Sequence, residues 1–113
     1  RQEVIEGNAD ITIGGRHKIY INKDGATDNH YDIQIGPNAS VNIQVDKGDM
    51  NVVLKEGKMN TNVSGDYNMK VGGNYNLQVQ GNILEEAVGE SSTKTSNVTG
   101  NVIHRGKEIH LNP

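Results

Sequence analysis

The sequence has no cysteine, no tryptophan and no phenylalanine, and only two of its 113 residues are proline. The absence of cysteine excludes disulfides and thiolate metal sites, although it does not fix the redox compartment. Positive charge is also scarce, because 11 Lys and Arg residues stand against 14 Asp and Glu residues. A net charge of −3 gives no basic surface for phosphate backbones, so no nucleic-acid partner is predicted.

Long apolar runs are missing as well. No stretch is long and apolar enough to predict a membrane helix or a signal peptide. Hydrophobic residues make up 33% of the chain, and its aromatic side chains are four tyrosines. A single chain this poor in large apolar groups would bury little core by itself. Disorder is therefore one interpretation of the composition, but the apolar residues occur in a regular order.

Glycine recurs every eight residues over much of the sequence. In the clearest stretch, NVSGDYNMKVGGNYNLQVQGN at 62–82, Asp or Asn follows each octad's first glycine. Insertions at 23–28, 45–47 and Glu56 interrupt the octads. We predict a bend at each octad start, where glycine supplies a backbone conformation that other residues resist. The predicted corner glycines are Gly7, Gly15, Gly48, Gly57, Gly65, Gly73, Gly81 and Gly89.

The third, fifth and seventh residues of each octad are mostly apolar, and the residues between them are mostly polar. This is the period of a β-strand with one buried and one solvated face, and the frequent Val and Ile favour a strand. A helical stripe is the alternative, but repeated glycine and asparagine disfavour it. The inward core is predicted at the seventh residues: Ile13, Ile21, Ile35, Ile43, Leu54, Val63, Val71 and Val79.

One extended segment and one corner per octad make a coil of strands. One chain could stack upon itself, or three chains could wind together. The thin apolar inventory favours three chains, because three copies would pool their inward residues in one axial core. Each backbone would then find hydrogen-bond partners on its neighbours and leave no open sheet edge.

The octads resemble the C-terminal octapeptide-repeat needle of the cell-puncturing spike at the tail tip of contractile-tailed phages. The related VgrG spike of type VI secretion is similar. That family's unit begins with Gly, continues with Asn or Asp, and ends with an inward Val and a polar residue. The resemblance covers roughly residues 5–96 and is strict over 57–82. The matching residues include Gly65, Asp66 and Val71, and then Gly73, Asn74, Val79 and Gln80.

The resemblance implies an all-β fold, an intertwined triple-stranded β-helix (a β-prism) formed by a parallel homotrimer. We divide the chain accordingly. Residues 1–47 are an N-terminal β-helix portion with insertions at 23–28 and 45–47, residues 48–96 are a regular octapeptide-repeat β-helix, and residues 97–113 are an irregular tip.

The resemblance also implies a structural function. The chain would be the needle of a virion tail spike, at the tail tip or baseplate, that pierces the bacterial outer membrane during injection. A type VI secretion spike is the alternative location. A trimeric tail-fibre or adhesin fragment that binds surface glycan is the alternative function. No catalytic motif is present, so no enzymatic activity is predicted.

The C-terminal residues 97–113 form the predicted tip of the needle. In the resembled family a small PAAR-type tip protein often covers this end, and it would bind by adding to exposed strand ends. Some spikes hold an iron ion there through two alternating histidines, a spacing that this chain lacks. No metal is therefore predicted, and His104 and His110 remain weak candidates. The tip residues are Ile103, His104, Ile109, His110 and Leu111.

Glu85 falls on the inward set of its octad, together with Ile83 and Ala87. Three copies would bring three carboxylates together, which is costly unless a lysine, water or a cation pairs with them. Ser91, Thr93 and Thr95 are predicted to follow as the next inward set, which would line residues 83–96 with hydroxyl groups. No cofactor is predicted, and an axial ion near Glu85 or at the tip stays open.

Overall fold

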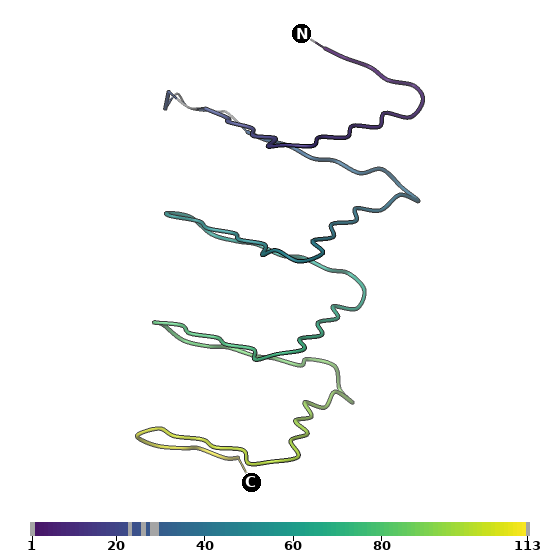
Figure 1. Ribbon diagram of the computed structural model, residues 1–113. Helices are drawn as coiled ribbons and strands as arrows, with labels where there is room; N and C mark the ends of the chain where they lie inside the picture. Colours follow the sequence, from purple (N-terminus) through teal and green to yellow (C-terminus); the bar gives the residue numbers. More distant parts are fainter. Residues whose placement is uncertain (1, 23, 26, 28–29, 113) are drawn as a thin grey trace. The chain divides into compact units, whose positions relative to one another are not determined.

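The computed structural model of the chain describes residues 2–22, 24–25, 27 and 30–112. Their backbone runs in extended segments separated by bends, and none of these residues belongs to a helix or to a strand (Figure 1). The chain divides into two units, Arg1–Met59 and Asn60–Pro113. No helix long and apolar enough to cross a membrane is found among the described residues.

The predicted all-β fold, an intertwined triple-stranded β-helix, is wrong for the part of the chain that the structure describes. No two described residues twelve or more positions apart in the sequence have Cα atoms within 8 Å of each other. The alternation of apolar and polar residues specifies extended backbone. A strand exists only where a second extended segment supplies hydrogen-bond partners, and here the bends bring no such segment alongside.

Bends divide both units at short intervals. In Arg1–Met59 they lie at residues 6–7, 14–15, 21–22, 24, 27, 37–38, 46–48 and 55–57. In Asn60–Pro113 they lie at residues 64–65, 72–73, 80–81, 89–91, 99–100 and 107. Each of the eight predicted corner glycines is located in one of these bends. The bends at 46–48 and 55–57 are a residue longer than most and coincide with the insertions at 45–47 and Glu56.

The corner glycines do not have the backbone conformation that we expected. Among the described glycines, only Gly25 has a positive φ, at 82°. Two asparagines adopt the left-handed conformation instead, Asn22 with φ 59° and Asn38 with φ 60°. Asn38 follows Pro37, and this order matches the two central positions of a type II turn. Backbone conformation therefore does not explain why glycine occupies the other corners.

The predicted insertion at 23–28 is described only in part, because Lys23, Ala26, Asp28 and the adjacent Asn29 lie outside the described residues. The N–H of Gly25 donates a hydrogen bond of 3.1 Å to the carbonyl of Asn22. This bond closes a local turn at the start of the insertion.

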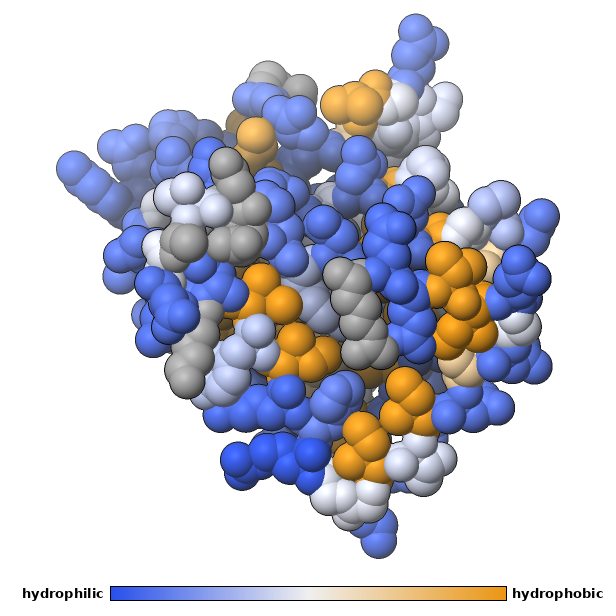
Figure 2. Space-filling view, turned by 90° about the horizontal axis from the view of Figure 1, so that it is seen from above, coloured by the Kyte–Doolittle hydropathy of each residue, from blue (hydrophilic) through white to orange (hydrophobic). Residues whose placement is uncertain are grey.

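None of the described side chains is buried. The chain exposes 13463 Å², whereas a compact monomer of 12.3 kDa exposes about 6,100 Å². Figure 2 shows apolar side chains lying open among hydrophilic ones. The single chain therefore has no hydrophobic core in its described part, and most of the surface that a folded domain would bury stays accessible.

We expect the backbone amides of residues 57–82 to exchange hydrogen at nearly the rate of an unstructured peptide when a chain is isolated. The described backbone offers these amides no partner within the chain, and unpartnered amides exchange freely. Chains released by denaturant and diluted to nanomolar concentration provide the isolated species, and mass spectrometry measures the exchange. Raising the concentration should slow it. Slow exchange at the mass of one chain would contradict the open structure.

Candidate functional site

The predicted inward residues lie exposed, but their exposed fractions repeat from octad to octad. Six of the eight are between 44% and 47% exposed, the lowest values among the described large apolar side chains. The other two, Ile43 at 70% and Leu54 at 55%, precede the longer bends at 46–48 and 55–57. The six are Ile13, Ile21, Ile35, Val63, Val71 and Val79. The regular bends thus give a recurring apolar position that stays about half exposed in the single chain.

Side-chain pairs two positions apart show that the extended segments keep a period of two. The Lys18 Nζ lies 4.4 Å from the centre of the Tyr20 ring. The Gln44 amide donates a hydrogen bond of 2.7 Å to Asp46. Alternate residues therefore share a side of the backbone, as the octad pattern requires, although no sheet holds the segments.

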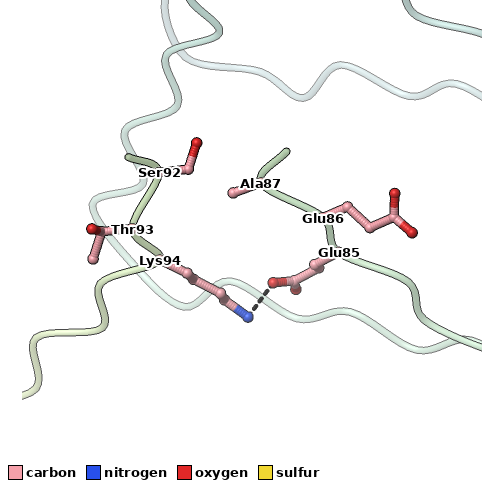
Figure 3. A pocket seen from close by; sticks show the side chains of 6 residues that line it. All are labelled: Glu85, Glu86, Ala87, Ser92, Thr93 and Lys94. Carbon is pink, nitrogen blue, oxygen red and sulfur yellow. Dashed lines mark ion pairs between the residues drawn. The ribbon is translucent and has the colours of Figure 1, made fainter. Parts of the chain in front are cut away.

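A hollow of about 480 Å³ lies within Asn60–Pro113, where the chain turns at residues 89–91. The N–H of Ser92 donates a hydrogen bond of 3.0 Å to the carbonyl of Gly89, which closes the turn. The turn makes the segments before and after it face each other (Figure 3). The lining residues are Glu85, Glu86, Ala87, Ser92, Thr93 and Lys94.

Lys94 forms an ion pair with Glu85 across this hollow (Figure 3). The two side chains are 69% and 56% exposed in the single chain. Water screens a pair at that exposure, so it contributes roughly 0–1 kcal/mol to the stability of an isolated chain. Ala87 and Ser92 also point towards each other, whereas Glu86 points away from the hollow. Glu85, predicted to need a lysine, water or a cation, thus has a lysine partner in its own chain.

The turn also corrects the predicted register beyond Gly89. We expected Thr93 on the side of Glu85 and Ala87, but Lys94 lies on that side and Thr93 points the other way. The predicted position of Thr93 in the set Ser91, Thr93 and Thr95 is therefore wrong. Its cause is a three-residue insertion at 89–91, which delays the next octad.

With this insertion the octad runs from Ser92 to Thr99, and the next begins at Gly100, where the chain bends again at 99–100. The sequence carried a signal for this register that we missed. Val98 is the seventh residue of the corrected octad, and Gly100 and Asn101 follow it as Gly81 and Asn82 follow Val79.

The predicted tip residues lie on both sides of the bend at Lys107. The side chains of Ile103, Ile109 and Leu111 are exposed. The Nε2 atom of His110 lies 3.0 Å from the Oε2 atom of Glu108, the second residue before it. Within the described residues, no group of three or more His, Cys, Asp or Glu side chains is arranged to hold a metal ion.

Comparison of the chain with protein-family models, with curated proteins and with solved structures finds no match. The resemblance to the phage spike needle therefore depends on the octads alone. The function, partners and location that it implies stay predictions.

We expect Gly89→Ala to lower the stability of the protein by less than about 1 kcal/mol, because a serine hydroxyl can rotate away from the new methyl group. A Cβ atom at Gly89 would lie 2.7 Å from the Oγ atom of Ser92. Ser92→Ala in the same chain should remove this clash and restore the stability. Denaturant midpoints of the two single variants and the double variant measure the coupling. Strictly additive effects would contradict the turn geometry.

Proposed function

We propose that the chain is one protomer of a homotrimeric structural needle that pierces the bacterial outer membrane. Such a needle would act at the tail tip or baseplate of a contractile phage, or in a type VI secretion spike. The observation that carries this proposal is a repeated glycine that the chain itself does not require.

Six of the eight corner glycines lack both of the usual reasons for glycine, a positive φ and a crowded Cβ position, within their own chain. Those at described octad starts lack a positive φ. Around six of them, a Cβ atom would meet nothing within 4 Å. These six are Gly7, Gly15, Gly57, Gly65, Gly73 and Gly81. No contact within the chain therefore accounts for glycine at these six positions, and the close approach of a backbone from another copy would account for it.

The exposed area indicates how extensive that approach must be. The chain exposes 13463 Å², and reaching the roughly 6,100 Å² of a compact protein of its size would require covering about 7,000 Å². Interfaces of standard size cover about 800 Å² on each partner. A partner that covers this much must follow the chain along most of its length. Other copies of the same chain carry the matching eight-residue repeat, and three is the number that the resemblance implies.

A mechanical function suits such an assembly. Copies that contact one another at every octad separate only when many weak contacts break together, so dissociation is slow. A stable protomer would then not exist apart from its partners. The outer membrane is contacted only transiently. The exposed side chains of Ile103, Ile109 and Leu111 are where a PAAR-type tip protein would bind.

We expect the protein to have a solution mass of three chains of 12.3 kDa and to keep it on an unheated denaturing gel. Sedimentation equilibrium and the gel measure this, and purified bacterial surface glycan is added as the control ligand. A stable, compact monomer would contradict the proposal. Saturable binding of glycan would instead favour the tail-fibre or adhesin function.

We also expect Gly73→Ser to weaken the association by at least about 2 kcal/mol, because a side chain would meet the approaching copy. The matched control is Gly72→Ser at the neighbouring position. Both glycines are open in the single chain, but Gly72 is the eighth residue of its octad, where other octads have Ser64 and Gln80. Gly72→Ser should therefore change the stability by less than about 0.5 kcal/mol.

Denaturant unfolding of the assembled protein at several concentrations measures both variants. Equal effects at the two positions would contradict a close approach at the octad starts. A gain of stability in both would show that the free chain governs stability, because removing a glycine then acts on the unfolded state alone.

A further inference from the structure

We propose that the ion pair between Glu85 and Lys94 sets the axial register of the associated copies. This inference rests on the proposed association of copies and adds to it the residues that align them. It starts from an ambiguity in the repeat.

The octads at 65–72 and 73–80 carry nearly interchangeable side chains on their apolar side. Tyr67 and Tyr75 occupy the third position, Met69 and Leu77 the fifth, and Val71 and Val79 the seventh. If one copy slips by eight residues along another, apolar groups still meet apolar groups. Repeats of this kind specify register weakly, because the slipped arrangement buries nearly the same surface.

The segment that follows differs from these octads. Glu85 occupies the fifth position of its octad, on the same alternating side as Ile83 and Ala87. The ion pair and the turn closed by Gly89 and Ser92 place Lys94 on that side as well (Figure 3). A charged pair therefore lies on the side of the chain that is apolar in the two preceding octads, 65–72 and 73–80.

Association would withdraw this pair from water. In a three-fold arrangement, like positions of the copies lie together, so three neutral Glu85–Lys94 pairs would form one polar layer. A copy slipped by one octad would place its pair against Leu77 of a neighbour. Charged groups removed from water without polar partners are costly, and a buried polar group that fixes register is the best-attested use of such groups.

The pair also replaces the axial ion that a ring of three Glu85 carboxylates would need. Lys94 supplies one positive charge for each carboxylate within the same chain. The layer of three pairs is then neutral without a cation, and its effect is on alignment more than on stability.

A spin label at one position tests the register. The chain has no cysteine, so Asn68→Cys supplies a unique attachment site on the polar side of its octad. Electron-electron double resonance then measures the distance between labels in the assembled full-length protein. Copies in register give one distance, because a three-fold arrangement has equal sides.

The decisive variant is Glu85→Leu with Lys94→Leu. We expect it to keep the mass of three chains and to show a second label distance, with a corresponding loss of the first. Exchanging the charges, with Glu85→Lys and Lys94→Glu, should restore the single distance. The matched control is Glu86→Leu with Thr93→Leu, which places the same two leucines on the opposite side and should leave one distance.

Two results would overturn the proposal, and they are distinguishable. If the two-leucine variant at 85 and 94 has the mass of three chains and a single label distance, the ion pair does not set the register, and the proposed needle is unaffected. If the unmodified chain has the mass of one chain and shows no coupling between labels, the proposed association fails, and the register inference fails with it.

Discussion

An extended chain that bends every eight residues brings no second segment alongside its apolar side chains in the part that the structure describes. The rest of the structure depends on this constraint. Each bend redirects the backbone before a second segment can lie alongside, so hydrogen bonds stay local, as in the turn from Gly89 to Ser92. The recurring half-exposure of Val63, Val71 and Val79 has the same origin. Folding free energy comes mainly from burial, and the described part of a single chain buries no side chain.

Six of the corner glycines have no explanation within the single chain. Within the chain, an alanine at Gly73 would be neither strained nor crowded. Its recurrence every eight residues is therefore not explained by contacts within the chain, and the proposed association of copies would account for it. Asn38 makes the opposite case, since Pro37 and the positive φ of Asn38 form a bend whose sequence is explained locally. The bend at Pro37 and Asn38 is thus explained within the chain, whereas the glycine at Gly73 would be explained by the proposed assembly.

The segment at 85–94 shapes the turn within one chain and would also affect how the proposed copies align. A three-residue insertion creates a turn, the turn changes the register, and the new register brings Lys94 to Glu85. In one hydrated chain this pair contributes little. Among associated copies the same pair would be the polar exception in a repeating apolar surface. The pair would then act by making an arrangement in which one copy has slipped by an octad less stable than the aligned one.

The sequence by itself determined the extended backbone, its alternation and the position of nearly every bend. These follow from the two-residue period of side chains and from local turn chemistry, which neighbouring residues specify. It did not determine strand pairing, since hydrogen bonds between segments depend on which backbones meet in space, and the predicted β-helix is absent from the described residues. The tertiary structure decided that Lys94 and not Thr93 faces Glu85, because this depends on the hydrogen-bonded turn between the two segments. Only the tertiary structure shows that the space beside glycines such as Gly73 is open, because sequence spacing does not say which atoms lie nearby.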